Sequence, residues 1–182
     1  LWFEQGRPTQ QARQAVGILA HCAEDGLDPA AYGAGELGRA VAEADRGATL
    51  PAEALASLDR ELTTAMRRYL SDLHFGQVDP RLISENYSAT VRSFDADKAL
   101  QDAVRRNSLL EAVAKAAPPF PLYAELRLAL AQYRRLAADT ARTPLWKQKL
   151  PPLPGKKVEL GQTWEGLPML IQRLIALGDM PA

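Results

Sequence analysis

Apolar residues recur at intervals of three and four along most of the chain, which is the spacing of one face of an α-helix. The longest such run lies between Pro51 and Gly76. Proline is tolerated in the first turn of a helix, and glycine often follows the last turn. We therefore predict one long amphipathic helix between these two residues. Its inward face would carry Leu55, Leu58, Leu62, Ala65, Met66, Tyr69 and Leu73.

Two shorter helices are predicted before this one. The first runs from about Thr9 to Asp25, where Gly26 provides a natural stop. Asp28-Pro29 combines an N-cap residue with proline at the first helical position. This pair predicts the start of a second helix that reaches toward Ala44.

The stretch from Gln77 to Phe94 is the least regular part of the chain, and Asp79-Pro80 marks a turn within it. Asp95 is placed to cap a helix that runs to about Ala117, where prolines follow. The residues expected to face inward on this helix are Leu100, Ala103, Val104, Leu110 and Val113.

Pro121 is expected to begin a further helix that ends near Ala141. One side of it would carry Leu122, Leu126, Ala129, Leu130, Tyr133, Leu136 and Ala137. Prolines at 144, 151, 152 and 154 then predict a stiff connector, and Leu167 to Leu177 forms a last amphipathic helix. Three tyrosines lie on apolar stripes and are expected to pack in the core with their hydroxyls at its edge: Tyr69, Tyr123 and Tyr133.

Composition supports helices over strands. The 182 residues include 31 Ala and 27 Leu, against 19 Val, Ile and Thr together. We therefore expect an all-α protein, an irregular multi-helix bundle. The length suits one domain, or one domain with a fragment of a second. Because the chain begins at Leu1 rather than Met, we expect it to be a piece of a longer protein.

The net charge of the chain limits the classes of partner that it can attract. The 22 Lys and Arg balance the 22 Asp and Glu, so no global charge attracts nucleic acid or a membrane surface. No apolar run approaches the roughly 20 residues that span a bilayer. We therefore predict neither a nucleic-acid partner nor a membrane-spanning segment.

No recognised catalytic or metal-binding pattern is present in the sequence. Cys22 is the one cysteine, which excludes an intramolecular disulfide and a multi-cysteine metal site. It follows His21 directly, and neighbours on a helix point about 100° apart, so the two cannot form one catalytic pair or bind one metal together. We expect Cys22 to be a small buried or half-buried side chain, because free cysteine usually behaves as a hydrophobic residue. We predict no catalytic residue, no cofactor and no metal. The acids Asp59, Glu61 and Asp72 alternate with arginines, as solvated ion pairs on a helix do.

Basic residues gather in the second half of the chain. Between residues 127 and 157, eight Lys and Arg residues stand against a single acid, Asp139. Such a stretch suits an acidic partner domain or a carboxylate-bearing polymer, but a solvated helix face and a soluble linker are the simpler explanation. Single-stranded nucleic acid is disfavoured because the whole chain is neutral. The candidate contact residues are Arg127, Arg134, Arg135, Arg142, Trp146, Lys147 and Lys149.

An ordered series of residues resembles the non-catalytic N-terminal scaffold domain of the large murein L,D-transpeptidases of Gram-negative bacteria. The series includes Gly26-Leu27-Asp28-Pro29 with Tyr32, and Leu58-Asp59 with Leu62-Thr63, Ala65 and Tyr69. It continues with Asp72-Leu73, Gly76, Val78, Asp79 and Pro80, then with Pro119, Pro121, Tyr123, Leu126, Ala129-Leu130, Tyr133-Arg134 and Leu136-Ala137. Gly161, Leu167, Leu170, Arg173, Leu174 and Gly178-Asp179 resemble the opening of a peptidoglycan-binding module.

The resemblance implies a scaffold domain over residues 1–143, a Pro- and Lys-rich linker over 144–160, and a truncated start of a peptidoglycan-binding module over 161–182. Its parent enzymes form 3→3 peptidoglycan cross-links through a cysteine thioester, with the nucleophile in a Ser-x-Gly-Cys-x-Arg pattern. The residues around Cys22 do not match that pattern, so no catalytic residue is carried onto this chain.

The same resemblance implies a periplasmic location. It also implies partners: the catalytic and peptidoglycan-binding domains of the parent chain, together with peptidoglycan or other cell-wall synthesis proteins. The alternative is a stand-alone helical adaptor that binds peptidoglycan or a cell-wall protein.

Overall fold

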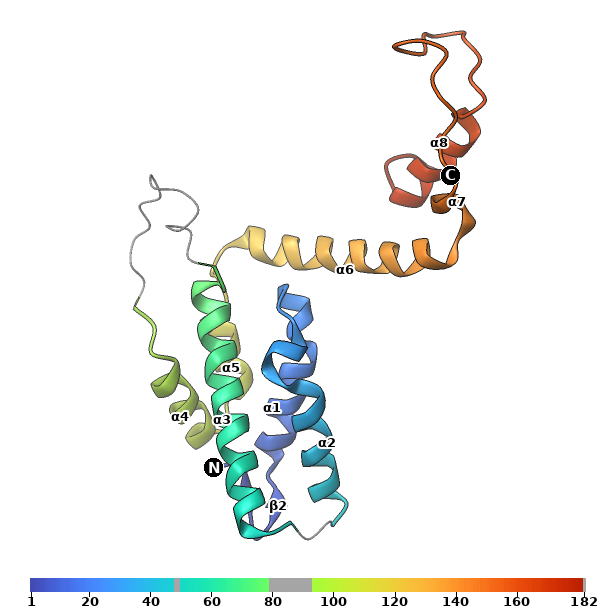
Figure 1. Ribbon diagram of the computed structural model, residues 1–182. Coiled ribbons are helices and arrows are strands. Elements are labelled where there is room, and N and C mark those ends of the chain that lie inside the picture. Colours follow the sequence, from blue (N-terminus) through green and yellow to red (C-terminus); the bar gives the residue numbers. More distant parts are fainter. Residues whose placement is uncertain (48–49, 79–92, 182) are drawn as a thin grey trace. The chain divides into compact units, whose positions relative to one another are not determined.

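The structure is a computed structural model and describes residues 1–47, 50–78 and 93–181 (Figure 1). It divides into two compact units, Leu1–Arg127 (unit 1) and Leu128–Ala182 (unit 2). Helices dominate both, which confirms the all-α prediction. The predicted turn at Asp79-Pro80 lies outside the described residues.

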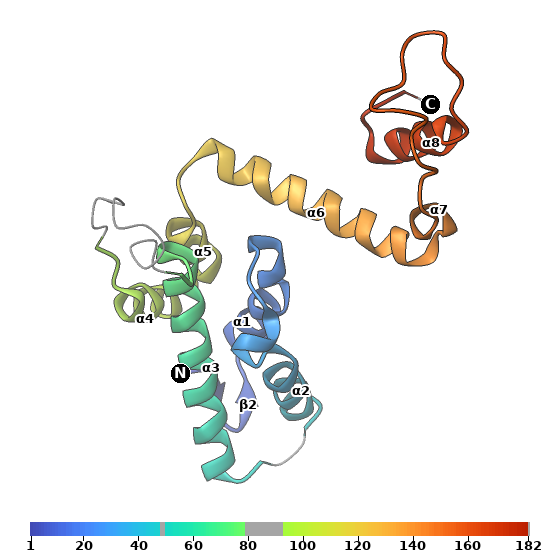
Figure 2. The same ribbon diagram turned by 45° about the horizontal axis from the view of Figure 1, so that its top comes forward.

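The long helix predicted between Pro51 and Gly76 is present as α3 (Ala52–Phe75). Its buried face consists of Leu58, Leu62, Ala65, Met66, Tyr69, Leu70 and Leu73. In both views α3 lies beside α1 (Gln10–His21), and α1 lies beside α2 (Ala34–Asp45) (Figure 2). On its other side α3 packs against α4 (Ala96–Arg106) and α5 (Leu109–Ala116). The core of unit 1 therefore forms around α3.

Local residues set several of the helix ends as predicted. After α1 the chain tightens into a 3₁₀ turn, η1 (Cys22–Asp25), and Gly26 closes it with φ of 80°. The side chain of Asp95 accepts a hydrogen bond from the Lys98 N–H at the start of α4. Cys22 is fully buried, as predicted.

Two predicted helices are interrupted. The helix expected from Pro29 to Ala44 is split at Gly33, whose φ of 62° separates η2 (Pro29–Tyr32) from α2. The helix expected from Asp95 to Ala117 breaks at Asn107, which adopts φ of 54° between α4 and α5. This break shifts the register of the second part, so Leu109 is buried and Leu110 is exposed. The prediction that Leu110 faces inward was therefore wrong.

A short hairpin near the start of the chain was not predicted. Strands β1 (Phe3–Glu4) and β2 (Arg7–Pro8) pair antiparallel across Gln5-Gly6. The preceding Trp2 is fully buried, and its indole N–H donates to Thr63 Oγ1 at 2.9 Å. The Trp2 backbone N–H donates to Asp59 Oδ1 at 2.7 Å. Asp59 is thus a structural acceptor, and its interpretation as solvated decoration was wrong.

Helix α6 (Pro121–Arg142) has the predicted extent but not the predicted packing. Leu122, Leu126 and Tyr133 are 59 to 65% exposed, so the apolar stripe does not face a core. Within unit 1, the side of α6 that meets the bundle carries Tyr123 and Arg127 instead, about one quarter-turn away. The prediction of a buried Tyr133 was wrong for this reason.

Unit 2 holds α7 (Pro144–Lys147) and α8 (Leu167–Leu177), the latter ending at Gly178 as the pattern predicted. Arg173 on α8 donates to the carbonyl oxygens of Leu145 and Gln148, and its guanidinium lies over the Trp146 ring at 5.6 Å. The indole N–H of Trp164 donates to the Pro152 carbonyl at 3.1 Å. Residues from the proline-rich stretch therefore contact α8.

Candidate functional site

A cluster of polar and aromatic side chains lies at the end of unit 1 where η1, the second half of α3 and the start of α6 meet. At its centre is Asp25, whose side chain is only 9% exposed. Its Oδ2 accepts a hydrogen bond from the Tyr69 hydroxyl at 2.9 Å, and its Oδ1 accepts one from the Tyr123 hydroxyl at 2.7 Å. Arg127 Nε pairs with the same Oδ1 at 2.9 Å. We call these four residues, Asp25, Tyr69, Tyr123 and Arg127, the Asp25 node.

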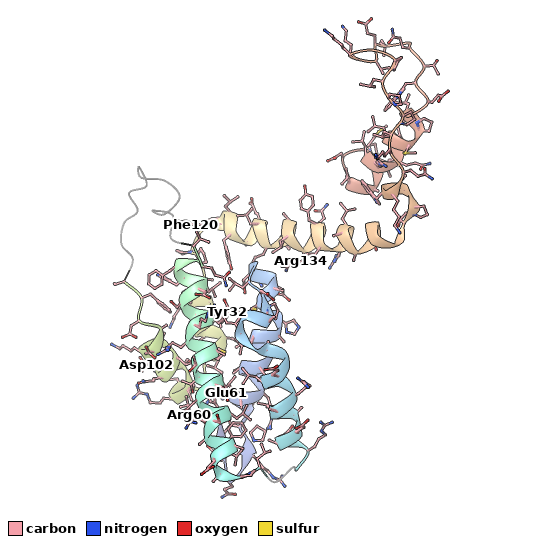
Figure 3. The ribbon with its side chains drawn as sticks, in the orientation of Figure 1. Tyr32, Arg60, Glu61, Asp102, Phe120 and Arg134 are labelled. Atoms are coloured by element: carbon pink, nitrogen blue, oxygen red, sulfur yellow. The ribbon has the colours of Figure 1, made fainter. Side chains whose placement is uncertain are left out.

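A second set of contacts adjoins the Asp25 node through the tyrosine rings. Tyr32, labelled in Figure 3, meets Tyr69 edge to face with ring centroids 5.9 Å apart. The Tyr32 hydroxyl donates to Asp72 Oδ2 at 2.8 Å, and the Gln77 amide donates to the Tyr32 oxygen at 3.3 Å. Arg68 lies over the Tyr32 ring at 5.6 Å. Asp72 also pairs with Arg68 Nε at 3.7 Å, so the predicted ion pair on the helix is present, but Asp72 in addition accepts a hydrogen bond from the Tyr32 hydroxyl and is a structural acceptor.

Burial sets the protonation of the three tyrosines. Burial raises the pKa of the Tyr69 hydroxyl above its ordinary value, and the neighbouring Asp25 carboxylate raises it further. The pKa values of Tyr123 and Tyr32 are raised by burial first, and then by hydrogen bonds to Asp25 and Asp72. A tyrosine hydroxyl is already protonated at neutral pH, and the raised pKa values keep these three hydroxyls protonated further into alkali, where they remain donors. The carboxylates accept these bonds, so this arrangement fixes elements in place and offers no activated nucleophile.

The predicted contact residues are spread over both units. Arg127 belongs to the Asp25 node and also pairs with Glu24 Oε2 at 2.9 Å. Arg134 (labelled in Figure 3) and Arg135 are exposed on α6, and Lys147 and Lys149 are exposed at and after α7. Trp146 is half-buried beneath Arg173, and the side chain of Arg142 lies outside the described part of the chain. A partner contact through these residues stays a prediction.

The sequence singled out only part of the cluster. Tyr69 and Tyr123 were expected in the core with their hydroxyls at its edge, and their positions confirm this. Asp25 was not singled out, because its partners lie 44 and 98 residues further along the chain. The local sequence, in which Asp25 immediately precedes the helix-ending Gly26, does not indicate those contacts.

Among the described residues, no three or more His, Cys, Asp or Glu side chains are grouped so that they could hold a metal ion. Across the same residues, no helix is both long and apolar enough to cross a membrane.

Comparisons with known proteins place this bundle in a family. A search of curated proteins and a search of solved structures each found no match. The family model described as Scaffold domain matches residues 1–130, a range that contains the whole core of unit 1 and the Asp25 node. Because this match covers most of the chain, the protein belongs to the Scaffold domain family.

Proposed function

We propose that this chain is the non-catalytic scaffold part of a periplasmic peptidoglycan L,D-transpeptidase. The observation that carries the proposal is the Scaffold domain match over residues 1–130. The ordered residues that resemble the murein L,D-transpeptidases support the identity of the parent enzyme. In this role the chain positions the catalytic and peptidoglycan-binding modules of its parent and performs no bond-making step.

The contacts of the Asp25 node suit a positioning role. The node joins η1, α3 and the first two turns of α6 through one carboxylate that is largely shielded from water. Hydrogen bonds to a charged, shielded acceptor are stronger than those between neutral groups. The start of α6 is thereby held in one place on unit 1, which is what a spacer between functional modules needs.

The proposal is tested first on the parent reading frame. We expect a segment encoding a secretion signal upstream, and downstream a His followed by Ser-x-Gly-Cys-x-Arg. A frame that ends near Ala182 and holds neither feature would remove the transpeptidase parent. In a second test, the purified chain is incubated with a disaccharide tetrapeptide, and we expect neither cross-linked nor hydrolysed products. Turnover by this chain would contradict the non-catalytic role.

A second candidate function is binding of the acidic cell-wall polymer, and the charge of unit 2 favours it. Unit 2 carries eight Lys and Arg residues against four Asp and Glu, whereas unit 1 has an excess of acids. Co-sedimentation with purified sacculi tests this function. Binding should weaken as salt rises and when Arg135, Lys147 and Lys149 are replaced by Ala. Replacing the exposed Arg39 and Arg46 of unit 1 is the matched control and should leave sedimentation unchanged.

A further inference from the structure

An apolar stripe runs along α6, and none of its residues belongs to the core of unit 1. Its members are spaced alternately four and three residues apart, and we call them the α6 stripe: Leu122, Leu126, Ala129, Tyr133 and Leu136. Leu122, Leu126 and Tyr133 are 59 to 65% exposed, and the other two are half-buried. Among the α6 side chains that the structure describes, none is buried. Exposed apolar patches mark surfaces at which proteins interact.

The spacing of the α6 stripe indicates the kind of partner that fits it. Alternation of four and three residues is the heptad spacing, in which the side chains of one helix insert between those of another helix. From residue 122 to residue 136 the stripe is about 21 Å long, which corresponds to two heptads. No charged residue is part of it. A second helix with the same apolar spacing is therefore the partner that matches this face.

The charges of the two units point to a second copy of this chain as the source of that helix. Unit 1 carries 14 Lys and Arg against 18 Asp and Glu, whereas unit 2 carries eight against four. Helix α6 begins in unit 1 and continues into unit 2. Two copies that pair antiparallel along α6 therefore bring the acidic unit of each copy toward the basic unit of the other. A parallel pair would bring units of like charge together instead.

We infer that the α6 stripe is a self-association surface through which two copies of the chain form an antiparallel, two-fold symmetric dimer. In such an interface the same patch of both copies is in contact, so it must complement itself. Ala129 lies at the middle of the stripe, and its small side chain lets two helices approach closely there. Because the stripe is short, we expect a weak dimer with a dissociation constant on the order of tens of micromolar. At low micromolar concentrations the chain is then a monomer.

Sedimentation equilibrium of the whole 182-residue chain measures this association at concentrations from about 5 to about 500 µM. We expect monomers at the lower end of this range and dimers at the upper end. Because opposite charges attract across the dimer, raising the salt from about 20 mM to about 500 mM should weaken the association severalfold. A chain that stays monomeric over the whole range at low salt overturns the inference, and so does an association that salt does not weaken.

Leu126→Glu places a charge within the stripe of both copies and should weaken dimerisation at least tenfold. Leu128→Glu is the matched control. Leu128 is 73% exposed and lies two residues further along α6, about 160° around the helix from Leu126. Both positions are exposed in the single chain, so both variants should fold, and Leu128→Glu should dimerise as the wild type does. Equal dimerisation of the two variants overturns the inference.

Cysteine cross-linking tests the antiparallel orientation. Ala129→Cys places a thiol near the two-fold axis, so mild oxidation should join two copies by a disulfide. Leu122→Cys lies near one end of the stripe, where antiparallel pairing separates the two thiols by about 20 Å, beyond the reach of a disulfide. The native Cys22 is fully buried and is not expected to react. Cross-linking of Leu122→Cys as efficient as that of Ala129→Cys overturns the inference. All of these outcomes leave the scaffold role intact, because the parent reading frame tests that role separately.

Discussion

Asp25 holds the end of unit 1 together, because two tyrosines from different elements and Arg127 all depend on its carboxylate. Asp25→Ala should lower the free energy of unfolding by about 2–4 kcal/mol, since it leaves shielded donors without an acceptor. Urea denaturation measures the loss. Asp45→Ala is the matched control. It breaks an exposed pair with Arg13 and should cost less than about 1 kcal/mol. Equal losses in the two variants would contradict the central role of Asp25.

The raised pKa values of Tyr32, Tyr69 and Tyr123 predict a loss of stability in alkali. In the unfolded chain these hydroxyls ionise near pH 10, whereas folding holds them protonated to higher pH. Their contribution is therefore fully present below about pH 10 and is lost as the pH rises further. Each tyrosine can add up to about 1.4 kcal/mol per pH unit to the decline. Urea denaturation between pH 8 and pH 11 measures this slope.

Tyr69→Phe removes one of the three ionising groups and should make the alkaline decline shallower. Its stability at pH 8 should also be lower, because Asp25 Oδ2 loses its donor. Tyr133→Phe is the matched control, since Tyr133 is 65% exposed on α6. A slope that is the same in the wild type and in Tyr69→Phe would show that Tyr69 does not carry the effect.

Two leucines with the same sequence pattern differ in their surroundings. Leu62 on α3 is fully buried, so Leu62→Ala should cost about 2–5 kcal/mol. Leu126 lies on the stripe of α6 that periodicity marked as inward, yet it is 59% exposed. Leu126→Ala should therefore change stability by about 0.5 kcal/mol or less. Thermal unfolding of both variants checks the difference, and a large loss in Leu126→Ala would mean that α6 is covered in solution.

At the scale of elements, the glycine that precedes α2 and a glycine inside α2 contribute differently to stability. Gly33 has φ of 62° and separates η2 from α2, so Gly33→Ala should cost about 1–2 kcal/mol. Gly38 lies inside α2, and an added Cβ there would meet nothing within 4 Å. Gly38→Ala should instead stabilise the protein by about 0.5–1 kcal/mol. Denaturant unfolding of the two variants should therefore shift in opposite directions, and a loss in both would contradict the assignment of the break to Gly33.

Helix ends could be predicted where the deciding residue is adjacent in sequence. Gly76, Asp95 and Gly178 each close or cap a helix through contacts with neighbours a few residues away. The break at Gly33 was missed because Gly35 and Gly38 follow it and both remain helical. Composition alone does not tell which of three nearby glycines turns left-handed.

The candidate site was harder to predict, because its contacts join distant parts of the chain. Tyr123 could be placed at a core edge from periodicity, but its partner Asp25 lies 98 residues earlier. The burial of Trp2 depends in the same way on Thr63 and Asp59, which belong to α3. Periodicity identifies the apolar helix faces that need to pack against another element. It does not identify the neighbour, and on α6 it marked a stripe that the bundle leaves exposed.

For the whole molecule, the distribution of buried residues shows which of the two units contributes the stability of the fold. In the described residues, every buried hydrophobic side chain lies between Trp2 and Ala116, within unit 1. Along α8 of unit 2, the apolar side chains that the structure describes are half-buried or exposed, and none is buried. Burial of apolar surface is the main stabilising contribution to folding. The stability of this chain should therefore reside in unit 1.

Truncation tests this division. A chain cut after Arg142 loses α7 and α8 but keeps the core and the Asp25 node, so its thermal midpoint should stay within about 3 °C of the whole chain. A chain cut after Phe120 also keeps the core but loses Tyr123 and Arg127, which bind Asp25. With about 3 kcal/mol lost, its midpoint should fall by about 10 °C. Circular dichroism at the helical band measures both. Equal midpoints for the two truncated chains would show that the first turns of α6 are not held by the Asp25 node, and the positioning role would lose its structural basis.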